Sequence, residues 1–295
     1  MTDPAPKPGD GRTGGILANA PYRVASVTLV ANDLAKVARF YQDVIGLASI
    51  SQEPSLVRLG VGATVVLSLR ADPDARPWSQ GEAGLFHTAF LLPTRADLGA
   101  WLRHAEEAGI TLTGAADHLV SEAVYLTDPE GNGIEIYVDR PDPAWQWTED
   151  GSVVMRNARL DHAGLVAAAD QPWAGMPAGS RVGHVHLQVG DLDATERFYA
   201  GLLGFDIMCR YPGALFLGSG GYHHQLAGNI WNSQGAPVRA DGTTGLAEIT
   251  LVADDDISES VRSRFRDAGL PLIEDGETLV LRDPWGTSLR LAPKP

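Results

Sequence analysis

Residues 23–47 read RVASVTLVANDLAKVARFYQDVIGL, and the same pattern returns without a gap at residues 181–205 as RVGHVHLQVGDLDATERFYAGLLGF. Each copy opens with alternating or apolar residues, which is typical of a strand. An aspartate follows that can cap a helix, and the amphipathic stretch after it ends at a glycine. The chain is therefore a duplication whose copies each begin with a strand and a helix.

A second repeat lies within each half. GLFHTAFLL at 84–92 resembles GLAEITLVA at 245–253, and LTDPEGNGIEIY at 126–137 resembles LRDPWGTSLRLA at 281–292. Short strands separated by Gly- and Asp-rich turns follow each helix. The sequence thus predicts four βαβββ modules, at residues 22–80, 84–140, 180–235 and 244–293. One such module has a curved face that it cannot cover alone, so we expect an α+β fold in which paired modules form two curved-sheet clefts.

The domain organisation follows from these repeats. We expect a flexible leader at residues 1–21, since this stretch is rich in Pro, Gly and polar residues. The first domain covers 22–140, and the second covers 180–295. Residues 141–179, which contain PDPAWQWTEDG and DQPWAGMPAGS, form the linker between them.

Composition limits the class of protein. With 44% apolar and 20% charged residues among 295, the chain can bury a full core. Its formal charge of -14 disfavours nucleic acid and anionic lipid as partners. The single cysteine, Cys209, cannot form an internal disulfide, so we expect a cytoplasmic protein. We also expect a homo-oligomer.

Three residues could bind a metal. Glu135 lies on the otherwise apolar strand GIEIY, and a buried carboxylate is costly unless it is paired or bound to a metal. His87 and His184 each occupy the fourth position of a module's opening strand. Two neutral imidazoles and one carboxylate are the facial triad typical of non-haem Fe(II) oxygenases. These three side chains could supply such a metal site.

The repeat resembles the vicinal oxygen chelate superfamily over nearly all of residues 22–293. This superfamily includes glyoxalases, fosfomycin-resistance proteins, bleomycin-binding proteins and extradiol ring-cleaving dioxygenases. HLVSEAVYLTDPEGNGIE, residues 118–135, resembles the extradiol dioxygenase signature, in which a His, a Tyr, an Asp-Pro-x-Gly turn and a terminal Glu recur. The resemblance is to the two-domain, catechol 2,3-dioxygenase-like branch.

The resemblance implies a role for eight residues. They are the metal ligands His87, Glu135 and His184, the catalytic residues His118, Tyr125 and His224, and the substrate-binding residues His186 and His223. His118 and Tyr125 would hydrogen-bond the substrate, and His224 would accept and return a proton with a pKa near the unperturbed value of about 6.5. His186 and His223 would line the pocket or support its ligands, unless their role is structural.

The sequence departs from the family pattern in one respect. Module four has Glu248 and Arg290 where the pattern has His and Glu, and module one has Ser26 in place of a ligand. Pairing module one with two, and three with four, would therefore split the triad. We expect instead that module two pairs with module three, within the chain or across a dimer, and that modules one and four form a metal-free pair.

The resemblance implies an Fe(II) enzyme, or less often a Mn(II) enzyme. It would cleave catechol or a substituted catechol beside its hydroxyls, insert both atoms of O2, and yield a 2-hydroxymuconic semialdehyde-type product. Two alternatives stay open. A glyoxalase-like divalent-metal isomerase or lyase would use the same cleft without O2, and a metal-free protein would bind an aromatic or antibiotic ligand there.

Overall fold

The computed structural model describes residues 15–294, and within them the four predicted modules are present. Module one comprises β1 (Tyr22–Ala31), α2 (Leu34–Asp43), β2 (Ala48–Glu53), β3 (Leu56–Val61) and β4 (Thr64–Ala71). Module two comprises β5 (Gly84–Leu91), α3 (Arg95–Glu107), β6 (Gly114–Asp117), β7 (Ser121–Thr127) and β8 (Gly133–Asp139). Module three comprises β9 (Arg181–Gln188), α5 (Leu192–Thr195), η2 (Glu196–Leu202), β10 (Asp206–Tyr211), β11 (Ala214–Gly218) and β12 (Leu226–Asn229). Module four comprises β13 (Gly245–Ala253), α6 (Asp255–Asp267), β14 (Ile273–Asp275), β15 (Thr278–Arg282) and β16 (Ser288–Pro293).

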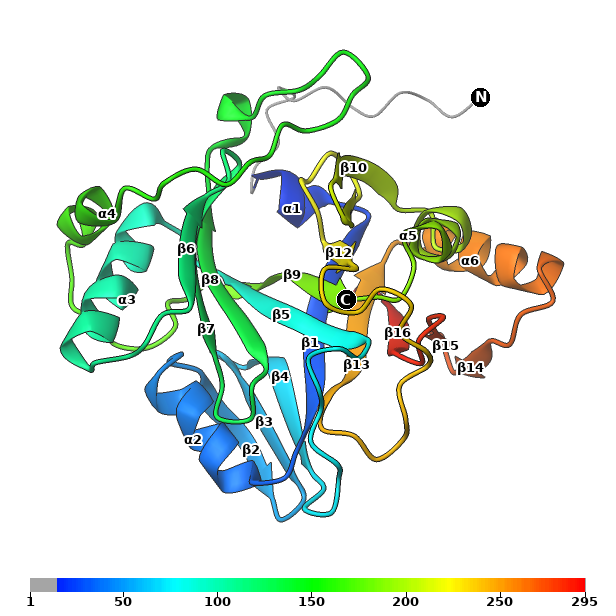
Figure 1. Cartoon of the computed structure of the whole chain (residues 1–295), viewed down its shortest axis with the longest axis horizontal. Helices are drawn as coiled ribbons and strands as arrows, with labels where there is room; N and C mark the ends of the chain where they lie inside the picture. Colours follow the sequence, from blue (N-terminus) through cyan, green and yellow to red (C-terminus); the bar gives the residue numbers. More distant parts are fainter. Residues whose placement is uncertain (1–14, 295) are drawn as a thin grey trace.

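The modules pair into two eight-stranded sheets. One sheet has the order β6-β7-β8-β5-β9-β12-β11-β10, so it joins module two to module three through the antiparallel pair β5–β9. The other has the order β14-β15-β16-β13-β1-β4-β3-β2, so it joins module four to module one. The expected α+β fold is confirmed, and so is the pairing of module two with module three, which occurs within a single chain (Figure 1).

Local sequence signals begin the helices as expected. The Asp33 carboxylate accepts a hydrogen bond of 3.0 Å from the backbone N–H of Lys36, and Thr94 forms a capping box with Asp97. Module three differs, because its helix continues after α5 as the π-helix η2. In this wider helix Phe198 is buried next to the buried Tyr199.

Repeated motifs also connect modules within each half. Tyr41 of module one donates a hydrogen bond of 3.4 Å to Asp128 of module two, and Tyr199 of module three donates one of 3.0 Å to Asp283 of module four. All four side chains are buried. The sheets therefore join the two halves of the chain, while the Phe-Tyr and Asp-Pro-x-Gly motifs hold together the modules of one half.

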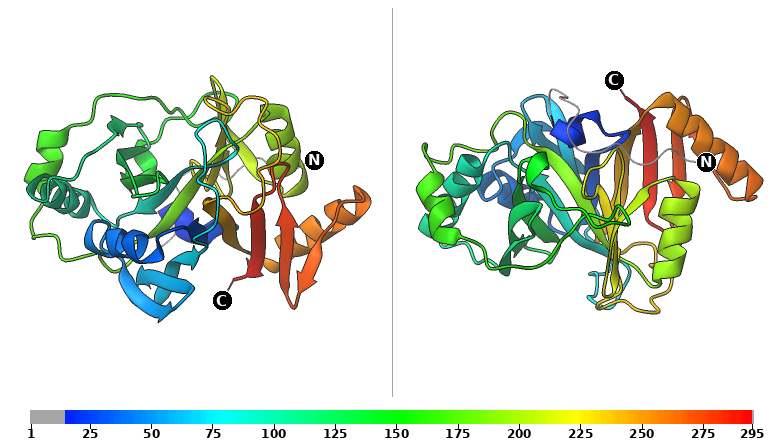
Figure 2. Two further views of the ribbon diagram at one scale, coloured as in Figure 1. Left: turned by 60° about the horizontal axis from the view of Figure 1, so that its bottom comes forward. Right: turned by 90° about the horizontal axis from the view of Figure 1, so that it is seen from above.

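The central strands of the two sheets contact each other, β1 against β9 and β13 against β5, and Figure 1 shows them crossing. Tyr22 stacks on Phe205 in this core, with ring centroids 4.2 Å apart. The helices lie on the outside, where α6 (orange) covers one end and α3 lies beside α4 at the other (Figure 2). No helix among residues 15–294 combines the length and the apolar character required to cross a membrane.

The segment between the halves contains η1 (Asp142–Ala144) and α4 (His162–Ala168), and α4 packs against α3. Of the predicted leader, residues 1–14 lie outside the described part. Its remainder contains α1 (Gly15–Asn19), where Leu17 is buried in a cluster with Trp145 and Tyr222. The division into two domains at residues 141–179 stays a prediction.

Candidate metal centre and its cavity

Three adjacent strands bring the predicted metal ligands together. In the β8-β5-β9 part of the sheet, Ala89 on β5 pairs with Glu135 on one side and with His184 on the other. His87 lies two residues before Ala89 and therefore projects from the same face of the strand. Ala89 is fully buried, and its methyl group leaves room for the three longer side chains. Strand register alone thus makes Glu135, His184 and His87 neighbours.

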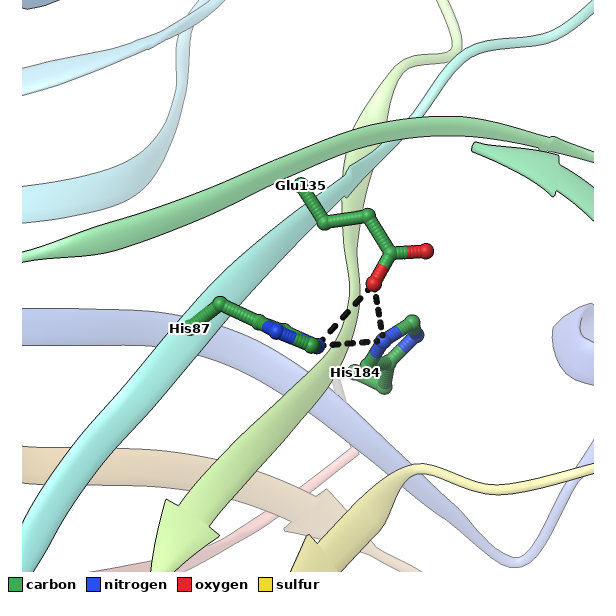
Figure 3. Close-up of side chains that lie close together, drawn as sticks. All are labelled: His87, Glu135 and His184. Atoms are coloured by element: carbon green, nitrogen blue, oxygen red, sulfur yellow. Dashed lines mark hydrogen bonds and ion pairs between the residues drawn. The ribbon is translucent and has the colours of Figure 1, made fainter. Parts of the chain in front are cut away.

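The ligand atoms of these side chains converge on one point (Figure 3). The Glu135 Oε2 atom lies 3.0 Å from His87 Nε2 and 3.2 Å from His184 Nε2, and the two imidazole nitrogens are 3.3 Å apart. All three residues are buried. Within residues 15–294, they are the only group of at least three His, Cys, Asp or Glu side chains arranged closely enough to hold a metal ion.

The electrostatics suit metal binding. Burial would raise the pKa of Glu135, but the charge of His184 and hydrogen bonds from both imidazoles hold it well below its ordinary value. Burial lowers the pKa of His184 to about 4, although Glu135 opposes this shift. Metal ligands must be an ionised carboxylate and neutral imidazoles. The ionised Glu135 and the neutral His184 therefore fit a divalent cation, and His87 supplies a second imidazole to the donor set.

Gly133 places Glu135 by allowing close contact between β8 and β5. A Cβ atom added to Gly133 would lie 1.9 Å from the backbone oxygen of Phe86, which precedes His87. We expect Gly133→Ala to lower the free energy of unfolding by about 1–3 kcal/mol, because backbone must move to relieve this overlap. Urea denaturation measures the effect. Gly114→Ala is the control, since its Cβ would make only ordinary contacts, the nearest at 3.6 Å; equal midpoints for the two variants would contradict the prediction.

Tyr125 and His118 lie beside the cluster. Tyr125 on β7 pairs directly with Glu135 on β8, and its hydroxyl is 2.6 Å from His118 Nε2. Burial raises the pKa of Tyr125 well above its ordinary value, and the charge of Glu135 raises it further. The phenol therefore keeps its proton and can donate a hydrogen bond into the cavity that both residues line.

His224 and His223 occupy different positions despite their adjacency. His224 lines the cavity, and its ring centroid is 4.1 Å from that of His184. Burial lowers the pKa of His224 well below its ordinary value, with the charges of nearby histidines adding to the effect, so the expected value near 6.5 is wrong for this environment. His223 is fully buried behind it, and hydrogen bonds to His224 and Asp139 occupy its two ring nitrogens. The structure thus puts His223 behind His224, outside the set of residues that line the cavity.

The cavity above the cluster has a volume of about 790 Å³. His186 lies on its wall, where Asn229 donates a hydrogen bond of 3.0 Å to its Nε2 atom, and its ring contacts Phe86 and Trp231. The segment between modules two and three contributes residues 155–158 to the lining. Sequence reasoning missed Asn229 and residues 155–158, which lie outside the repeated motifs, and Phe86, which lies in the repeat GLFHTAFLL but has no metal-ligating or titratable side chain.

The other sheet lacks such a cluster. Its cleft is a smaller pocket of about 300 Å³, where Ser288 donates a hydrogen bond of 3.3 Å to Glu248. Arg290 forms an ion pair of 2.8 Å with Asp275. Module four thus has polar pairs at Glu248 and Arg290, the positions that correspond to His87 and Glu135 of module two.

Comparison with known proteins agrees with this architecture. The profile of the Glyoxalase/Bleomycin resistance protein/Dioxygenase superfamily matches residues 23–136 and 181–274. The chain belongs to this superfamily, as the resemblance of its repeats predicted.

Individual relatives indicate the enzyme class of this chain within the superfamily. A catechol-2,3-dioxygenase of Bacillus subtilis (strain 168) is 38% identical over 262 residues, which cover 87% of this chain and 92% of that protein. Biphenyl-2,3-diol 1,2-dioxygenase 3 of Rhodococcus globerulus is 28% identical over 120 residues, or 40% of this chain and 63% of that protein. The crystal structure of glyoxalase I from Zea mays shares the fold, with a TM-score of 0.58 at 16% identity over 94% of each chain. The relatives support the predicted enzyme class, an extradiol dioxygenase.

Proposed function

We propose that this protein is an Fe(II)-dependent extradiol dioxygenase that cleaves catechol or a substituted catechol to a 2-hydroxymuconic semialdehyde-type product, with Mn(II) as the alternative metal. The observation that carries the proposal is the buried cluster of His87, Glu135 and His184 at one wall of a cavity of about 790 Å³. Similarity to a catechol-2,3-dioxygenase over 87% of the chain supports the same assignment, and such relatives imply a divalent metal.

The roles proposed for the residues follow from their positions. His87, Glu135 and His184 would hold the metal, which when bound supplies a Lewis acid that eases deprotonation of a catechol hydroxyl. Tyr125, which stays protonated, would donate a hydrogen bond to a substrate oxygen, and His118 would orient its hydroxyl.

Residues of the cavity wall would have the remaining roles. His224, which burial keeps neutral, would accept a proton from the substrate and later return it. His186 would contact the substrate beside Phe86 and Trp231. These aromatic side chains would exclude water and pack against the ring of the diol.

Oligomeric state and location stay predictions. All three candidate ligands come from one chain, so a second copy is not needed to complete the cluster. The proposed cytoplasmic location depends on the single cysteine, Cys209, which is buried. The proposed partners are a small aromatic diol and O2.

The test is oxygen uptake by the protein after anaerobic loading with Fe(II), with catechol as substrate. We expect one O2 consumed per catechol and a yellow product. Turnover of a glyoxalase-type substrate with redox-inert metals and without oxygen uptake would instead support an isomerase or lyase. A protein that binds no stoichiometric iron or manganese after reconstitution would support a metal-free binding function.

A further inference from the structure

A chain of hydrogen bonds leads from the cavity to Asp139, a partly exposed carboxylate at the end of β8. His224 Nδ1 lies 2.7 Å from His223 Nδ1, and His223 Nε2 lies 2.9 Å from the Asp139 Oδ1 atom. The Asp139 side chain is 22% exposed, whereas His223 is fully buried. Only His224 of these three residues lines the cavity.

The direction of these hydrogen bonds can be derived from the carboxylate. An ionised carboxylate only accepts hydrogen bonds, so His223 must donate to Asp139 from Nε2. In the neutral form an imidazole carries one N–H, so Nδ1 of a neutral His223 is then an acceptor. With His223 in that form, the hydrogen on the short Nδ1–Nδ1 contact belongs to His224. The remaining nitrogen of His224, Nε2, has an unshared lone pair and no hydrogen-bond partner among the described residues.

Two buried tyrosines support the acceptor role of Asp139. Tyr222 donates a hydrogen bond of 3.0 Å to Asp139 Oδ2, and Tyr137 lies 2.8 Å from the Tyr222 hydroxyl. Burial raises the pKa of both phenols well above the ordinary value, and the charge of Asp139 adds to the shift, so each phenol is a donor. Tyr222 therefore donates to the carboxylate, and Tyr137 can donate to Tyr222.

We propose that Asp139 and His223 are positioning residues that fix His224 in the tautomer with Nδ1 protonated and Nε2 free to act as a base toward the cavity. This is the role that a buried aspartate has toward a catalytic histidine in serine proteases. The inference rests on the proposed acid/base function of His224, and it adds Asp139, which the sequence motifs do not mark.

The tautomer can be measured without any assay of activity. In the full chain labelled with 15N-histidine, the His224 signals are assigned by their loss in His224→Gln. We expect the 15N shifts to show a protonated Nδ1 and an unprotonated Nε2 in the wild type. Asp139→Asn should reverse or mix the tautomers, because its amide can donate to His223 Nε2. A wild-type His224 with a protonated Nε2 would overturn the inference.

Kinetics of the Fe(II)-loaded enzyme provide the second test. Asp139→Asn and His223→Leu should each lower kcat by about 10²-fold with KM and metal content unchanged, since general acid/base catalysis contributes about 10²–10⁴-fold. His223→Gln should lose less than about 10-fold, because its side-chain oxygen can still accept the His224 Nδ1–H. Tyr222→Phe is the matched control, since it removes a hydrogen bond to the same carboxylate but leaves the imidazole pair intact.

The outcomes separate this inference from the proposed function. Full kcat in Asp139→Asn and His223→Leu, or equal losses in all four folded variants, would overturn the positioning role while leaving the dioxygenase assignment in place. Far-UV circular dichroism establishes that each variant is folded. If the wild type cleaves no catechol, the proposed function fails, and the tautomer measurement still decides whether Asp139 and His223 set the state of His224.

Discussion

Glu135→Ala is expected to lose the metal and, with it, all measurable ring cleavage. Glu135 provides the only carboxylate of the cluster, and its Oε2 atom lies within 3.2 Å of both imidazole nitrogens. Removing outer partners of metal ligands typically costs about 10–100-fold in affinity, so loss of a charged ligand should weaken binding by more than about 10²-fold. Metal content after gel filtration, together with oxygen uptake in the presence of catechol, measures both effects.

Glu248→Ala is the matched control for this variant. Glu248 is also a carboxylate on a central strand, β13, but it belongs to the sheet of modules one and four, where its partner is Ser288. We expect this variant to keep stoichiometric metal and wild-type turnover. Glu135→Ala with unchanged metal content and unchanged activity would show that the cluster is not the metal site, and His184→Ala would then be expected to behave in the same way.

The fold could be predicted from sequence because its main signals are local and repeated. The strand, capping aspartate and terminal glycine of residues 23–47 recur at 181–205, and the same order of elements appears in the structure. The prediction of which modules pair was less direct. It followed from ligand types alone, since Ser26, Glu248 and Arg290 could not complete a triad, and the antiparallel pair β5–β9 confirms it.

The surroundings of the site were harder to predict, because distant contacts leave no local pattern. Asp139 ends a strand whose sequence gives no sign that His223 would reach it across 84 positions. Residues 155–158 belong to a segment that the sequence identifies only as a linker, yet they line the cavity. The predicted pKa of His224 was wrong for a related reason. Burial lowers the pKa of this imidazole, and the extent of burial depends on contacts that the local sequence does not show.

His224→Gln is expected to lower kcat by about 10²–10⁴-fold while metal content stays at the wild-type level, the range that general acid/base catalysis typically contributes. His224 lines the cavity next to His184, but it does not belong to the group of residues whose ligand atoms converge. Its loss should therefore leave KM close to the wild-type value. Steady-state oxygen uptake over a range of catechol concentrations separates kcat from KM.

His162→Gln is the control for this substitution, because His162 lies on α4 with 43% of its side chain exposed and pairs with Glu106 rather than with the cavity. The pattern across variants is the decisive result. Glu135→Ala should remove metal and turnover together, whereas His224→Gln should remove turnover alone. If His224→Gln also lost its metal, His224 would be a ligand rather than a base. If its kcat stayed at the wild-type level, the proton would have to be accepted elsewhere, and Tyr125 with His118 would be the remaining pair within reach of the same cavity.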